Sequence, residues 1–191
     1  MHTTPPDKLF DPYYQVIVEY AHGSIDHRRE LELLELGVRA GDDHAMYALG
    51  SLLVNVSPED DVPWKRDIPR GIALIRRATR SVHMAMMELA SFHEDGEHGV
   101  RKSEKKAFEL FARAVEFGSV PGRFHLGRCH YFGVGTSVNR RRAAALFRAA
   151  ANLGFPVPDL TDPAWYEPDP DPSPRRSGSR TGTAAFTPKS R

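Results

Sequence analysis

The stretch GVGTSVNRRRAAALFRAAANLG, residues 133–154, decides how this chain of 191 residues folds. Its apolar residues recur at the i, i+3, i+4, i+7 and i+8 spacing of one helix face, at Ala143, Leu146, Phe147, Ala150 and Ala151. The same stripe stands 36 residues earlier, at Ala107, Leu110, Phe111, Ala114 and Val115. A weaker copy stands another 36 residues earlier, at Gly71, Leu74, Ile75, Ala78 and Thr79. A repeat period of this length is typical of solenoid folds, and most solenoids serve to bind other molecules on their surface.

Each stripe predicts the second helix of a pair, and a first helix precedes it. The first helices carry a small residue where a neighbouring helix could approach closely, at Gly50, Ala90 and Gly127. Good N-caps stand before the second helices, at Asp67, Ser103 and Asn139. The candidate caps of the first helices are Asp42 or Asp43, Ser81 and Ser119. We predict an all-α fold, a right-handed superhelical solenoid of about four antiparallel helix pairs.

The composition divides the chain into three parts. We predict a flexible N-terminus over residues 1–10 and a solenoid over residues 11–155. Its units span residues 11–41, 42–82, 83–118 and 119–154, and the first unit is degenerate. Residues 156–191 are rich in Pro and Asp, then in Ser and Arg, so we expect a mostly disordered tail. The aromatic residues Trp165 and Tyr166 are exceptions to this disorder. We expect them either to cap the last helix pair or to form a short motif that binds a partner.

This pattern resembles that of Sel-one-like repeats, which are relatives of tetratricopeptide repeats. The last unit matches it at Leu126, Gly127, Gly133, Gly135, Ala143, Ala150, Ala151 and Gly154. The middle unit matches it at Ala85, Leu89, Gly96, Gly99, Val100, Lys106, Ala107, Ala114 and Gly118. His93 and His130 replace the usual Tyr, and the turn Gly96–Gly99 is one residue longer than the Gly-x-Gly turn of the family pattern. The resemblance implies a helical scaffold or adaptor, and it says little about the partner.

The rest of the composition excludes several classes. The start of the chain has neither the basic nor the apolar region of a secretory signal, and no apolar run reaches 18 residues. A single cysteine, Cys129, excludes an intramolecular disulfide framework. We therefore expect a cytoplasmic protein that does not contact membranes.

Two clusters contain residue types that could do chemistry. His93–His98 contains metal-ligand types, but a glycine intervenes and the two histidines are five apart, so a solvated polar turn is expected. His125, Cys129 and His130 suggest a thiol–imidazole pair, but no third orienting group is evident. A packed histidine beside a buried thiol is therefore expected. We predict no catalytic residue, cofactor or metal, and a hydrolase-like enzyme is the weakest alternative.

The charge is strongly bipolar along the chain. Residues 1–60 contain 11 acids against 4 bases, and residues 119–154 contain six arginines and no acid. These arginines are Arg123, Arg128, Arg140, Arg141, Arg142 and Arg148. They could form a patch for an acidic protein, grip the phosphates of a nucleic acid or nucleotide, or simply form a solvated face.

The loop Asn55–Lys65 is the other candidate, because insertions in repeat arrays often lie on the binding face. It contains Glu59, Asp60, Asp61 and Trp64, and the tryptophan is either an anchor for a partner or a lid over its own unit. We predict a non-catalytic protein–protein interaction adaptor or regulatory scaffold. The alternative is a nucleic-acid-associated factor that uses the arginine-rich last repeat, although interleaved aromatic residues are lacking. Weak head-to-tail self-association of the bipolar chain is a further expectation.

Overall fold

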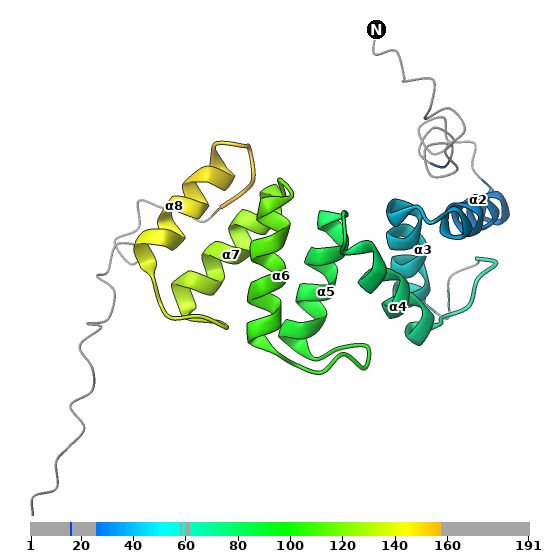
Figure 1. Ribbon diagram of the computed structural model, residues 1–191, viewed down its shortest axis with the longest axis horizontal. Coiled ribbons are helices and arrows are strands. Elements are labelled where there is room, and N and C mark those ends of the chain that lie inside the picture. The colour runs from blue at the N-terminus through cyan, green and yellow to red at the C-terminus, as the bar shows by residue number, and fades with distance from the viewer. Residues whose placement is uncertain (1–15, 17–25, 58, 60–61, 158–191) are drawn as a thin grey trace, which may run out of the picture.

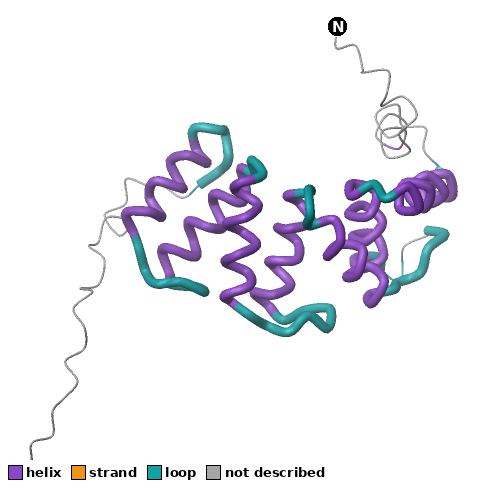
Figure 2. The backbone as a smooth tube through the Cα atoms, viewed as in Figure 1, coloured by secondary structure: helices purple, strands orange, loops and turns teal. Residues whose placement is uncertain are grey.

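The computed structural model describes residues 16, 26–57, 59 and 62–157, and every structural statement below concerns these residues. They form seven complete helices, and no strand occurs among them (Figures 1 and 2). The helices are α2 (His27–Ala40), α3 (Asp43–Asn55), α4 (Ile68–Ala78), α5 (His83–Asp95), α6 (Glu104–Glu116), α7 (Val120–Phe132) and α8 (Arg140–Ala151).

The helices pack in chain order, so the predicted all-α solenoid is confirmed. The tightest neighbours are α3 with α4, α5 with α6 and α7 with α8, which gives three pairs after α2 (Figure 1). Within the segment expected to form the first helix of the array, the structure describes Val16 alone, and its side chain is buried in the first core cluster. The predicted flexible N-terminus lies outside the described residues, as does the predicted disordered tail beyond residue 157.

Side-chain caps start most of the helices. The predicted caps accept a backbone N–H bond at the start of α3, α4, α6, α7 and α8, through Asp42, Asp67, Ser103, Ser119 and Asn139. The prediction of Ser81 as a cap is wrong, because Val82 begins α5 without a side-chain cap. The Ser81 hydroxyl instead donates to Asp43 Oδ2 at 2.6 Å.

The cap of each second helix also closes the loop before it. The backbone N–H of Asp67 donates to the Leu53 carbonyl at 3.0 Å. In the next two units, Ser103 and Asn139 donate in the same way to the carbonyls of His93 and His130, both at 2.7 Å. This repeated bond fixes where each second helix begins relative to the first.

Small residues let the paired helices cross closely. A Cβ added at Gly71 of α4 would lie 2.7 Å from the Gly50 carbonyl oxygen of α3 and 2.6 Å from a methyl of Val54. In the last pair, a Cβ at Gly127 would lie 2.7 Å from the Phe147 ring. The predicted close approach at Gly50 and Gly127 is confirmed.

The apolar stripes form two core clusters that meet at Leu110 of α6. This half-buried side chain packs against both the cluster around α2–α5 and the one around α6 and α7. Ala151, the last member of the predicted stripe of α8, is exposed, because no described helix covers it.

Candidate protein-interaction surfaces

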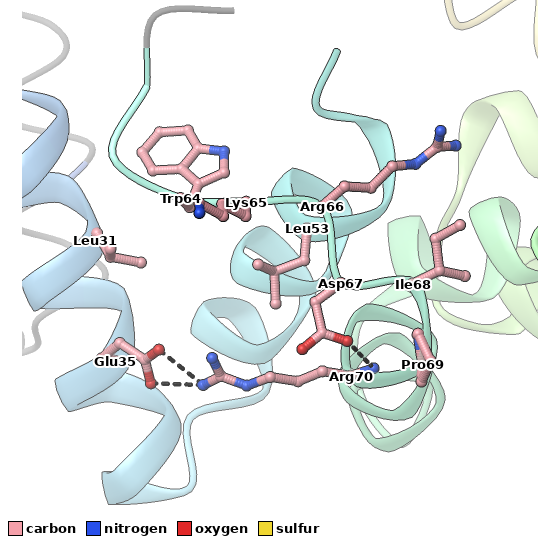
Figure 3. A pocket seen from close by; sticks show the side chains of 10 residues that line it. All are labelled: Leu31, Glu35, Leu53, Trp64, Lys65, Arg66, Asp67, Ile68, Pro69 and Arg70. Atoms are coloured by element: carbon pink, nitrogen blue, oxygen red, sulfur yellow. Dashed lines mark hydrogen bonds and ion pairs between the residues drawn. The ribbon is translucent and has the colours of Figure 1, made fainter. Parts of the chain in front are cut away.

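A pocket of about 620 Å³ lies where the loop before α4 crosses α2 and α3 (Figure 3). Its apolar part comes from all three segments, from Leu31, Leu53 and Trp64. At one side of the pocket, Nη2 of Arg70 in α4 donates to both carboxylate oxygens of Glu35, at 2.7 and 2.8 Å. The remaining lining residues are Lys65, Arg66, Asp67, Ile68 and Pro69.

Trp64 is packed and not extended into solvent. Its side chain is 8% exposed, and its ring meets the His27 ring edge-on at 5.5 Å between centroids. Of the two predicted roles, this burial supports a lid and not an anchor, and the lid also reaches His27 of the preceding unit. Lys65 and Arg66, which follow it at the pocket, are exposed, so the described part of this loop next to the pocket is basic.

The predicted acidic residues of the loop are described only in part. Glu59 is exposed, and its carboxylate accepts from the Ser57 hydroxyl at 3.4 Å. Asp60 and Asp61 lie outside the described residues, as do Trp165 and Tyr166 of the tail. Whether these side chains contact a partner stays a prediction.

Three of the six predicted arginines are tied into the fold. Arg123 donates to the carbonyls of Gly118 and Ser119, and Arg128 forms an ion pair with Glu94 of the preceding unit at 3.3 Å. The Arg140 guanidinium lies 5.5 Å from the centroid of the Tyr131 ring. These interactions restrict the freedom of the three side chains to meet a partner.

The other three arginines, Arg141, Arg142 and Arg148, are exposed on α8. Arg148 Nε donates to the Ala144 carbonyl of its own helix at 3.3 Å. The charge predicted for the last unit therefore reaches solvent mainly through one helix and not through a patch of six side chains.

The outer face of α8 differs from the corresponding face of α6. In α6, Phe108, Ala112 and Val115 pack into the cluster that α6 shares with α7. The residues at the same register 36 positions later in α8 are Ala144, Arg148 and Ala151. The phenylalanine and the valine are thus replaced by alanine and the alanine by arginine, as in the capping unit of a repeat array.

A second groove, which the sequence did not reveal, runs across the first helices of three successive units. We call it the α3–α5–α7 groove; its volume is about 440 Å³. It is lined by Tyr47 and Ser51 of α3, by His83, Met84, Met87, Glu88 and Ser91 of α5, and by Ser119 and Pro121 at the start of α7. Met84 and Met87 lie on one face of α5. They were the signal in the sequence that could have indicated this groove, because flexible methionines are common on adaptable binding surfaces.

Glu88 is the polar centre of this groove. Its Oε1 accepts from the Ser51 hydroxyl at 3.1 Å and from the Asn55 side-chain amide at 2.9 Å. Its Oε2 is covered from solvent and has no hydrogen-bond partner, and the same holds for Nδ1 of His83. Buried polar atoms are usually paired, so these two atoms need an explanation.

The turn predicted to be solvated is exposed at Asp95, Gly96, Glu97 and Gly99, whereas its two histidines pack against the protein. His93 is buried, and its Nδ1 donates to the Arg101 carbonyl at 3.0 Å. The His98 ring packs edge-on against Phe92 at 4.7 Å. The extra residue of this turn is accommodated by two consecutive left-handed conformations, at His98 with φ 52° and Gly99 with φ 74°. The expectation of a solvated polar turn therefore holds for the residues between the two histidines and not for the histidine rings themselves.

The second chemical cluster is packed as expected. Cys129 is buried, and burial raises the pKa of its thiol to about 11, with a smaller contribution from Glu94. Burial also lowers the pKa values of His125 and His130, and the nearby Arg128 and Arg142 lower them further. A thiol with such a pKa is a poor nucleophile at neutral pH. Within the described residues, no three metal-ligating side chains come together.

This fold defines a class of protein, the helical-repeat proteins. The profile of the Sel1 repeat family matches residues 83–118 and 120–155. These two segments, which hold α5 with α6 and α7 with α8, are thus Sel1-like repeats. Proteins with such repeats are generally protein-interaction scaffolds and typically non-catalytic.

Two solved structures are similar to this chain. A Sel1 repeat protein from Oxalobacter formigenes is 26% identical, with a TM-score of 0.59 over 66% of this chain and 91% of that one. The protein c5321, a protective antigen of uropathogenic Escherichia coli strains with an SLR fold, is 19% identical, with a TM-score of 0.64. That match covers 78% of this chain and 32% of the antigen, so it concerns the fold alone. No described helix has the length and apolar character needed to cross a bilayer.

Proposed function

We propose that this protein is a non-catalytic adaptor or regulatory scaffold that binds another protein through the surface of its solenoid. The α3–α5–α7 groove carries the proposal. It is open, it crosses three successive units, and it combines apolar side chains with unpaired polar atoms. Met84, which is 42% exposed, is one of the few large apolar side chains that the described helices leave in solvent. The wider family supports the same function.

An enzyme is a weaker explanation of the same residues. Cys129, the one thiol, is buried and has a raised pKa. The histidines nearest to it have lowered pKa values and pack against Phe108 and Phe111, as core residues do. A cytoplasmic location, which cell fractionation would test, completes the proposal.

Affinity capture with the full chain, followed by mass spectrometry, tests the proposal when it is paired with a groove variant. Met84→Lys places a charge in the groove at an exposed position, so the fold should persist. We expect the wild-type chain to retain at least one protein that the variant loses. Equal retention of every protein by both baits would refute binding through this groove.

A further inference from the structure

We propose that the α3–α5–α7 groove binds a peptide segment of a partner protein in which a lysine or arginine adjoins an apolar side chain, with Glu88 as the acceptor of the cation. The inference rests on the proposed function and specifies the chemistry of the partner. Glu88 is the one acidic residue among the nine that line the groove, and no lysine or arginine is among them. The groove therefore offers a single negative charge in otherwise neutral surroundings.

Other carboxylates between helices of this chain already have a cation. Glu35 pairs with Arg70, Asp43 with Arg80 and Glu94 with Arg128, at distances of 2.7, 2.7 and 3.3 Å. Glu88 occupies a comparable place between α3 and α5, but its partners are neutral groups on α3, and they engage one oxygen only. The free oxygen can accept a charge-assisted bond from an external ammonium or guanidinium group.

The surroundings of Glu88 suit an apolar neighbour of that cation. Met84 and Met87 precede Glu88 by four and one residues on α5 and line the same groove. Their unbranched side chains can rearrange to uncover the carboxylate and to pack on a bound side chain. His83 Nδ1 is covered and unpaired, so it could make a further polar contact with the main chain of a peptide once the same rearrangement uncovers it.

The dimensions suit a short segment. His83 and Ser91 are eight residues apart on α5, which is about 12 Å of helix. Two helix-to-helix steps from α3 to α7 add up to roughly 16–20 Å. An extended peptide covers that distance with about five or six residues. A heptapeptide is therefore a suitable probe.

The test is an array of random heptapeptides probed with the full chain, followed by fluorescence polarisation with the peptides retained best. We expect Lys or Arg beside Leu, Met, Ile or Phe to be enriched. Glu88→Gln should weaken binding of these peptides by about tenfold to a hundredfold, because a hydrogen bond to a charged group is lost. Glu109→Gln is the matched control, since it removes the same charge from an exposed position on α6. Far-UV circular dichroism checks that the variants are folded.

Several results would overturn the proposal. Enrichment of acidic peptides, no basic preference, or equal binding by E88Q and wild type would each do so. If no peptide binds while affinity capture still returns a groove-dependent partner, this inference fails and the scaffold function stands. A dimer mass in light scattering that E88Q alone abolishes would assign the groove to a second copy. Stronger peptide binding after charge reversal of Arg175 and Arg176 would assign it to the chain's own tail.

Discussion

Gly71→Ala tests the close crossing of α3 and α4. The added methyl would lie 2.7 Å from the Gly50 carbonyl oxygen and 2.6 Å from a Val54 methyl, whereas ordinary contacts begin at 3.4 Å. Because one obstacle is backbone, α3 and α4 must separate by roughly 0.7 Å. Overpacking of this kind lowers the free energy of unfolding by about 1–3 kcal/mol. The higher helix propensity of alanine offsets at most about 1 kcal/mol of this loss.

We therefore expect Gly71→Ala to lower the free energy of unfolding by roughly 1–2 kcal/mol. Urea denaturation followed by circular dichroism measures this change. The matched control is Ala107→Gly at the equivalent position of α6, which is fully buried and should destabilise the fold by about 1 kcal/mol or more. A stabilisation by Gly71→Ala of the size that helix propensity alone gives would refute the reasoning.

A second background isolates the steric cause. Val54→Ala removes one of the two groups that the new methyl would strike. In that background Gly71→Ala should cost less than in the wild type, by at least about 0.5 kcal/mol of coupling energy. Equal costs in the two backgrounds would mean that Val54 plays no part.

Four further outcomes are expected. Leu110→Asp should lower the free energy of unfolding by at least roughly 1.5–3 kcal/mol and open both core clusters to limited proteolysis; protection of either cluster would contradict its bridging place. Cys129 should react slowly with a thiol reagent at pH 8 and quickly in urea, because its folded pKa is about 11. His130 has a lowered pKa, so the stability it provides is present above pH 6.5 and is lost as the pH falls below; His130→Phe should raise the melting temperature and flatten this acid dependence. Mobility-shift assays with arbitrary RNA and DNA should show no binding at physiological salt; a strongly salt-dependent shift that Arg141→Glu with Arg142→Glu abolishes would instead favour the nucleic-acid alternative.

Much of the fold could be predicted from local chemistry. The caps at Asp42, Asp67 and Asn139 and the helices that follow them depend on a few consecutive residues, and a repeated stripe reveals them. Ser81 was predicted wrongly for the same reason, since its hydroxyl is engaged by Asp43 from 38 residues away. A pattern of neighbouring residues cannot show that a distant carboxylate engages the hydroxyl that would otherwise cap the helix.

The binding surfaces were less predictable, because they depend on how units stack. Trp64 is buried by contacts that include His27 of the preceding unit, and Arg128 is paired with Glu94 of the unit before it. Glu88 meets Ser51 and Asn55 only through the register of α5 against α3. The excess of arginines in the last unit was visible in the sequence, whereas its division into tied and exposed side chains was not.

The outer face of α8 is poorly suited to the stacking of a further helix pair. A further helix pair placed after α8 would meet Ala144, Arg148 and Ala151, at the register where Phe108, Ala112 and Val115 of α6 pack into the second core cluster. It would have to desolvate a guanidinium and would gain little apolar contact in return. These three side chains thus disfavour the stacking of another helix pair on α8. Exchanging them for their α6 counterparts would give α8 an apolar outer face on which engineered repeat units could pack.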